Sequence, residues 1–155
     1  MVAGLASPLV QIGSFLLDIT KNIVTMGDVM NELVTFAHAL ADPTRWRIIQ
    51  LLQEQALCVC EVADILKMPQ SSVSSHVQVI RKAGILQSER CEKWIYYRVS
   101  PSLRSLVMSL ADSFAASPTT DATLKLDAKN AIKRLAKRAE SCCPAPKVLC
   151  VATQV

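Results

Sequence analysis

Apolar residues recur at helical spacing along most of this chain beyond residue 27. Within 28–41, for example, Val29, Leu33 and Leu40 fall on one side of a helix. The boundaries carry residues suited to them, because Asp42-Pro43 can begin a helix and Gly84 can end one. The same period of three to four residues predicts helices over 28–41, 43–54, 58–67, 71–83, 101–115 and 121–140.

Two strands are expected directly after the helix over 71–83. Residues 85–90 form the first, and residues 93–99, which are rich in β-branched and aromatic side chains, form the second. The connection Cys91-Glu92 is short enough for a hairpin. Helix, short turn, helix and hairpin, in that order, predict a winged helix-turn-helix within a mainly α fold with a small β-hairpin.

The helix over 71–83 has two distinct sides. Val73, Val77 and Ile80 form a stripe that should pack inward, with short or flexible polar groups opposite. Such groups suit base edges and phosphates in a major groove, and Gln78 has the amide geometry to bond adenine. The alternative is that this polar side is simply solvated. The residues expected to contact DNA from this helix are Ser71, Ser72, Ser75, His76, Gln78 and Lys82.

His76 lies at the edge between the two sides, where it can bond a phosphate or cap a neighbouring group. The hairpin adds basic and aromatic groups that can straddle the DNA backbone or enter the minor groove. We assign Trp94 and Tyr96 to packing. The hairpin residues expected at the DNA are Arg90, Lys93, Tyr97 and Arg98.

Composition adds two constraints. The 155 residues carry a net charge of +4 and a pI near 8.8, which allows a nucleic-acid partner without requiring one. The six cysteines occur as a CxC pair, a lone residue and a CCx6C tail. This spacing favours ligands in a reducing cytoplasm over a disulfide framework. The first 20 residues are apolar but have no basic n-region, so a secretory leader is not expected. Gly4, Pro8, Gln11 and Gly13 also weaken the case for a membrane span there.

Four pieces of the sequence together resemble the ArsR/SmtB family of metal-responsive repressors: ALADPTRWRIIQLL, LCVCEVADIL, SSVSSHVQVIRKAGIL and KWIYYRVSP. The resemblance implies a homodimer that binds a palindromic operator in double-stranded DNA and releases it when metal binds. On this basis we expect a DNA-binding domain that also dimerises over 28–116. It would be preceded by an extension of unassigned structure over 1–27 and followed over 117–155 by a basic helix and a cysteine-containing tail.

In the arsenic-sensing branch of the family, an LCVC motif supplies ligands for arsenite, and Cys58 and Cys60 match it. Trivalent arsenic and antimony are thiophilic, so soft thiolates should be preferred to imidazole or carboxylate. A helix N-terminus should lower a thiol pKa and favour ligation. Residues i and i+2 of a regular helix point about 200° apart, so we expect ion binding to unwind the first turn and misplace the recognition helix.

The third thiolate has several possible sources. Some arsenic-branch members carry another cysteine where this chain has Ala63. Cys91 is expected at the wing tip, far from the pair. A cellular thiol can complete the shell, and the tail can be an unligated, redox-sensitive end. The tail cysteines that can reach the site, from the same or the partner protomer, or form a second site, are Cys142, Cys143 and Cys150.

Three functions compete at this point. The first is a cytoplasmic repressor induced by As(III) or Sb(III), with no organic cofactor. The second is a winged-helix sensor of cadmium, lead, mercury or thiol oxidation. The third is a cysteine-dependent enzyme or metal-delivery module, which is disfavoured because neither His38 nor His76 is near a cysteine in sequence. The helix over 121–140 can extend a dimer interface, touch DNA or be solvated.

Overall fold

The computed structural model describes residues 28–138, 145–147 and 149. The chain divides into two compact units, 1–35 and 36–155. A helix occupies residues 28–40, as the sequence predicts. The N-terminal extension over 1–27 and the three tail cysteines lie outside the described residues.

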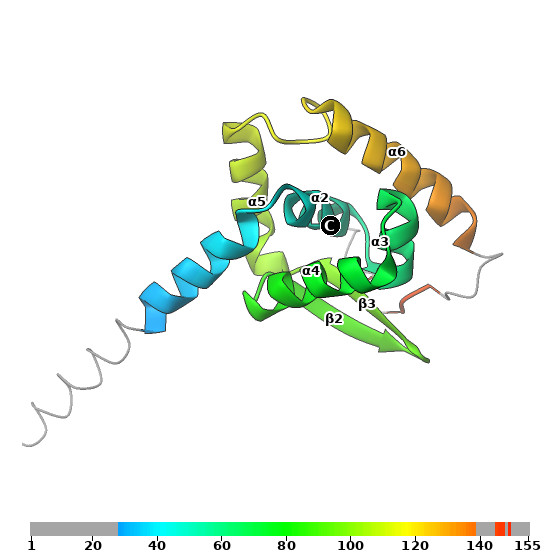
Figure 1. Ribbon diagram of the computed structural model, residues 1–155, viewed down its shortest axis with the longest axis horizontal. Coiled ribbons are helices and arrows are strands. Elements are labelled where there is room, and N and C mark those ends of the chain that lie inside the picture. The colour runs from blue at the N-terminus through cyan, green and yellow to red at the C-terminus, as the bar shows by residue number, and fades with distance from the viewer. Residues whose placement is uncertain (1–27, 139–144, 148, 150–155) are drawn as a thin grey trace, which may run out of the picture. The chain divides into compact units, whose positions relative to one another are not determined.

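Three helices form the centre of the second unit (Figure 1). Helix α2 (Pro43–Glu54) begins at Asp42, whose carboxylate accepts a hydrogen bond from the Arg45 backbone N–H at 2.8 Å, with a proline in the first turn. Helix α3 (Val59–Leu66) is followed by α4 (Gln70–Lys82). Gly84 adopts a φ of +72° and ends α4, which confirms its predicted role.

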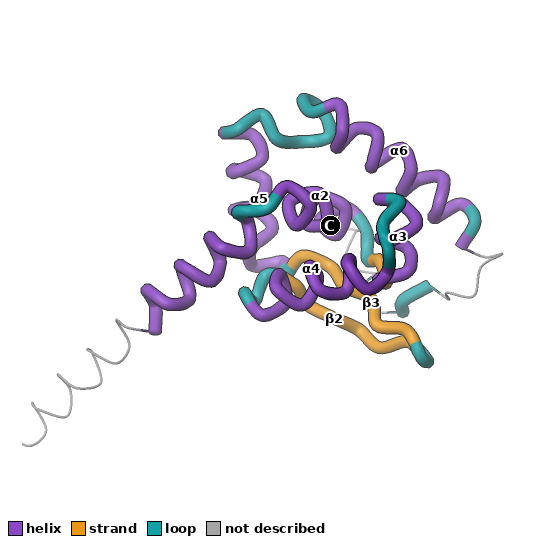
Figure 2. The backbone as a smooth tube through the Cα atoms, viewed as in Figure 1, coloured by secondary structure: helices purple, strands orange, loops and turns teal. Residues whose placement is uncertain are grey.

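The sheet has three strands, one more than the sequence predicts. Strands β2 (Leu86–Cys91) and β3 (Trp94–Val99) form the expected hairpin, and the two-residue strand β1 (Leu57–Cys58) pairs with the other edge of β3. All pairings are antiparallel, and β3 is central. Figure 2 shows the hairpin of β2 and β3. Cys91 is paired with Trp94, so the turn is Glu92-Lys93 and not Cys91-Glu92.

The core lies between α2, α3, α4 and one side of the sheet. Its completely buried side chains come from every one of these elements, which is why the winged helix-turn-helix behaves as one packed body. They are joined by Val107 of α5 (Pro101–Ser113). The members with essentially no exposure include Ile48, Ile49, Leu52, Leu57, Val73, Ile80 and Ile85.

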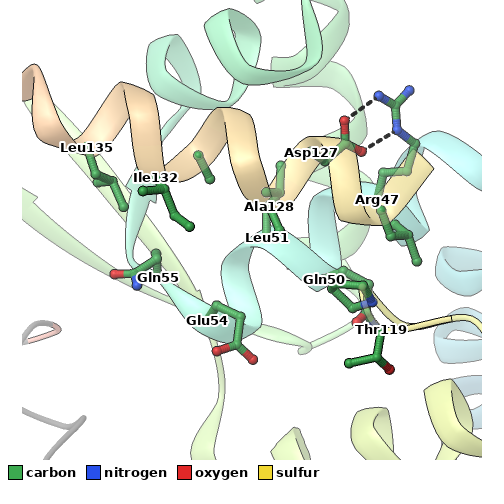
Figure 3. Close-up of a pocket in the computed structure, with 13 residues that line it drawn as sticks. Arg47, Gln50, Leu51, Glu54, Gln55, Thr119, Asp127, Ala128, Ile132 and Leu135 are labelled. Atoms are coloured by element: carbon green, nitrogen blue, oxygen red, sulfur yellow. Dashed lines mark hydrogen bonds and ion pairs between the residues drawn. The ribbon is translucent and has the colours of Figure 1, made fainter. Parts of the chain in front are cut away.

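Helix α6 (Ala122–Ala136) packs against α2 and α3 within the same unit. Leu124 and Ala131 are buried, while Lys125, Lys129 and Lys133 are exposed on the opposite side. The Arg47 guanidinium of α2 donates two hydrogen bonds, of 2.7 and 2.8 Å, to the buried Asp127 carboxylate of α6. A largely apolar cleft of about 400 Å³ runs between these two helices (Figure 3).

No helix in the described part of the chain is both long and apolar enough to cross a bilayer.

Candidate thiol site and DNA-contacting surface

Cys58 and Cys60 meet at the junction of the sheet and α3. Cys58 has an extended backbone (φ −87°, ψ 165°) and is the last residue of β1, while Cys60 is already in the first turn of α3. Their sulfur atoms are 2.7 Å apart. The expectation that the two thiols point in opposite directions is therefore wrong, because the regular helical angle does not apply to a residue outside the helix.

This geometry also removes the need for α3 to unwind. Two thiolates bonded at about 2.3 Å to one tetrahedral centre lie roughly 3.7 Å apart. The Cys58 and Cys60 sulfurs would have to separate by about 1 Å, within the reach of a side-chain rotation, for both to bind one ion. The site is thus close to a bidentate arrangement before any ion arrives.

Cys58 is 2% exposed, and this burial is the main reason why the pKa of its thiol lies above the ordinary value. The hydrogen bond with Cys60 and the negative charge of Glu61 act in the same direction. The expectation of a lowered pKa at Cys58 is therefore wrong, because desolvation outweighs the helix N-terminus. An ion that binds here must displace a proton from Cys58.

No third ligand converges on the pair among the described residues, where no group of three His, Cys, Asp or Glu side chains could hold a metal. Ala63, at the position of the additional family cysteine, is buried. Cys91 belongs to the same apolar cluster as Cys58, Tyr96 and Leu149, and its thiol faces the Ala145 carbonyl at 3.9 Å. Cys142, Cys143 and Cys150 lie outside the described residues.

Helix α4 presents the predicted polar side to solvent. Val73, Val77 and Ile80 are buried, as expected. Ser72 and His76 are half-buried, and the His76 Nδ1 lies 3.8 Å from Asp42 Oδ1. That contact supports the capping alternative for His76. The exposed residues of the predicted DNA-contacting set on α4 are Ser71, Ser75, Gln78 and Lys82.

The hairpin supplies fewer DNA contacts than the sequence suggests. Arg90 and Lys93 are exposed, but Tyr97 is only 4% exposed and Arg98 only 3%. Their assignment to the DNA surface is wrong, because β3 is covered on both sides at these two positions. Tyr97 packs in the main core, and Arg98 donates a 2.6 Å hydrogen bond to the Leu149 carbonyl on the other side. Neither β1 nor the contact of Leu149 with Arg98 was predicted from the sequence.

We expect Ser75→Glu to weaken DNA binding by about tenfold or more, because it places a carboxylate on the exposed side of α4, where phosphates would approach. Thr123→Glu adds the same charge on an exposed position of α6 and serves as the control. Fluorescence anisotropy with a labelled duplex measures both. Equal loss of affinity in the two variants would contradict a DNA-contacting role for α4.

The segment over 42–88, which contains α2, α3 and α4, matches the family model described as bacterial regulatory protein, arsR family. An uncharacterised helix-turn-helix transcriptional regulator from Methanocaldococcus jannaschii is 36% identical over 75 residues, which are 48% of this chain and 84% of that protein. This chain belongs to the arsR family. The family and its fold are those of DNA-binding transcriptional regulators.

Two other similarities concern the arsR-family part of the chain. The arsenic resistance transcriptional regulator ArsR1 of Pseudomonas putida is 38% identical over 50% of this chain, and the match spans 61% of that protein, less than two thirds. The homodimeric winged helix-turn-helix domain of Mb0332 from Mycobacterium bovis superposes with a TM-score of 0.52 at 23% identity. The superposition covers 58% of this chain and 87% of that domain, which shows that the two share a fold.

Proposed function

We propose that this arsR-family protein is a repressor that binds operator DNA and is released by trivalent arsenic or antimony bound to Cys58 and Cys60. The observation that carries the proposal is the 2.7 Å approach of the two sulfurs. Soft thiophilic ions prefer such paired thiolates to oxygen or imidazole donors. The relative ArsR1 is named for arsenic resistance, which supports the same choice of ion.

The release step would pass through the packing between α3 and α4. Rotation of the two side chains would bring both sulfurs onto the ion, and a third ligand would then pull on Cys60, which is part of the first turn of α3. Val62 and Ile65 of α3 pack in one core with Val73 and Val77 of α4. A shift of α3 therefore biases α4 away from the orientation that suits the major groove, as expected for a two-state element.

We propose the tail cysteines Cys142, Cys143 and Cys150 as the source of the third thiolate or of a second site. The support comes from the described residues beside them. Arg138 donates a hydrogen bond to the Ala56 carbonyl at 2.9 Å, two residues before Cys58. Leu149 packs in the same cluster as Cys58. Arg138 and Leu149, which precede and follow Cys142 and Cys143 in the sequence, therefore both lie near the thiol pair.

We propose a homodimer on a palindromic operator, with Lys82, Arg90 and Lys93 as phosphate contacts. Helix α5 supports dimerisation, because it exposes large apolar side chains that a monomer would leave in water. These are Leu106 and Met108, together with Phe114 directly after the helix, which is 76% exposed. Two copies of α4 held in this way would read half-sites about one helical turn apart.

The same sulfur distance supports one alternative, a sensor of another soft ion or of oxidation. Two thiols already in contact can form a disulfide by giving two electrons and two protons to an oxidant such as peroxide. The ion or oxidant that releases DNA at the lowest concentration would distinguish the arsenic or antimony sensor from this alternative.

The deciding experiment begins with a duplex selected from random sequences by the full-length protein. Fluorescence anisotropy then follows the bound fraction while arsenite, antimonite, cadmium, lead or mercury is titrated in under reducing conditions, and peroxide without reductant. We expect release by micromolar arsenite or antimonite. Binding with no release by either would contradict the proposed inducer, and release by cadmium or peroxide alone would establish the alternative.

A further inference from the structure

A buried carboxylate lies directly against the thiol site. The Glu61 side chain in the first turn of α3 is completely inaccessible to solvent. It accepts a hydrogen bond from the Cys58 backbone N–H at 3.0 Å and so fixes the end of β1 to the start of α3. A buried carboxylate is tolerated only where other groups neutralise and bond it.

Those groups come from the far end of the described chain. Arg138, two residues beyond the end of α6, donates from Nε and from its terminal nitrogen to the two Glu61 oxygens at 2.7 and 2.9 Å. Arg134 of α6 lies 4.0 Å from the same carboxylate. The Arg138–Glu61 pair is bidentate, a geometry that only the planar guanidinium provides.

Arg138 also bonds the chain on the other side of Cys58. It donates a hydrogen bond of 2.9 Å to the Ala56 carbonyl, and its guanidinium lies 5.7 Å from the centre of the Tyr96 ring. Tyr96 is the residue of β3 that pairs with Cys58. The Arg138 side chain therefore contacts Ala56 before Cys58, Glu61 after it and Tyr96 on the neighbouring strand.

Helix α6 is held in place independently of Arg138. Arg134 Nε donates to Asp64 at 2.8 Å, and the Asn130 amide reaches the Ile65 carbonyl at 3.5 Å. In Figure 1, α6 runs past the end of α3, in agreement with the contacts between the two helices. The family match ends at residue 88. Arg138, whose guanidinium bonds the residues around the thiol pair, therefore lies outside the matched segment.

We propose that Arg138 is a positioning residue of the thiol site: by holding Glu61 and the Ala56 carbonyl, it keeps Cys58 where its sulfur meets that of Cys60. This inference deepens the proposed function and rests on it for the identity of the ion. It assigns a role in inducer binding to the segment directly after α6.

The test uses phenylarsine oxide, a trivalent arsenical that needs only two neighbouring thiols. The parent is the full chain with Cys142, Cys143 and Cys150 changed to serine, so that the tail contributes no sulfur. Calorimetric titration gives the affinity of this parent and of its Arg138→Gln, Arg138→Lys and Lys137→Gln variants. Lys137 is exposed and adjacent, so Lys137→Gln is the matched loss of one positive charge.

We expect Arg138→Gln to weaken phenylarsine oxide binding by about tenfold, the lower end of the usual effect of losing a group that supports a metal ligand. Arg138→Lys should bind phenylarsine oxide as weakly as Arg138→Gln, because an ammonium cannot make the same set of bonds. Lys137→Gln should bind like the parent. Failure of the parent itself to bind would overturn the thiol site and the proposed function together. Equal binding by the parent and Arg138→Gln would overturn only the positioning role.

A second variant separates positioning from simple stabilisation. Glu61→Gln combined with Arg138→Gln removes the buried charge pair but leaves an amide oxygen for the Cys58 N–H. We expect the melting temperature to recover relative to Arg138→Gln while the arsenical affinity stays about tenfold weaker, because the Ala56 carbonyl is still without its guanidinium. Recovery of both quantities would show that Arg138 only neutralises Glu61, which would overturn the proposal.

Discussion

Changing both Cys58 and Cys60 to serine will leave operator affinity within about twofold of the unchanged protein and raise the arsenite concentration needed for release by at least about 100-fold. Serine is nearly isosteric, and neither residue lies on the exposed side of α4, so the DNA-contacting surface should persist. Its hydroxyl is a hard oxygen donor that binds a thiophilic ion poorly. Anisotropy of the selected duplex during arsenite titration measures both quantities.

Cys91→Ser is the matched control for this pair. Cys91 is also buried and belongs to the same apolar cluster as Cys58, but it makes no three-ligand group with the pair. We therefore expect Cys91→Ser to release DNA at the same arsenite concentration as the unchanged protein. Normal release by the double variant would move the inducer site elsewhere, and Cys142, Cys143 and Cys150 would become the leading candidates.

Arg47→Ala will lower the free energy of unfolding by about 3 kcal/mol, because it leaves the buried Asp127 carboxylate without its bidentate partner. Asp127 is only 3% exposed. This value is the lower end of the usual loss of stability on breaking a buried ion pair, because the Arg47 side chain itself keeps some contact with water. Urea denaturation, analysed with the slope held constant, measures the change.

Two further variants test the cause of that loss. Lys125→Ala removes an exposed charge from the opposite side of α6 and should change the free energy of unfolding by no more than about 0.5 kcal/mol. Arg47→Met with Asp127→Leu replaces the pair by apolar groups and should recover most of the stability. If Arg47→Ala behaved like Lys125→Ala, the ion pair would contribute little to the attachment of α6.

The sequence predicted the helices well because their signals are local. The inward stripe of α4, the capping aspartate before α2 and Gly84 after α4 each depend on neighbours within a few residues, and each was confirmed. Strand β1 was missed because it has only two residues. The same omission contributed to the errors at Tyr97 and Arg98, because the sequence predicted only a two-stranded hairpin, with β2 as the single neighbour of β3.

The site was predicted in part. The sequence identified Cys58 and Cys60 through their motif, but it placed both in a regular helix and therefore separated their sulfurs. The basic helix predicted over 121–140 included Arg134 and Arg138, but the sequence did not distinguish these two arginines from the lysines beside them. Their partners Asp64 and Glu61 are 70 and 77 residues away in sequence. No local pattern can indicate pairings over such distances, although an acidic residue inside the apolar segment around Val62 was a usable hint.

The contact between Glu61 and Arg138 has a consequence for the newly made chain. The 77 residues from Val62 to Arg138 take roughly 4–15 s to synthesise at about 5–20 residues per second. During that interval the cysteine pair has emerged, or is about to emerge, from the ribosome while its guanidinium does not yet exist. The thiols of a nascent chain are therefore held less firmly than those of the finished protein. A chain cut or stalled before residue 138 keeps its recognition helix but lacks this restraint on the thiol pair.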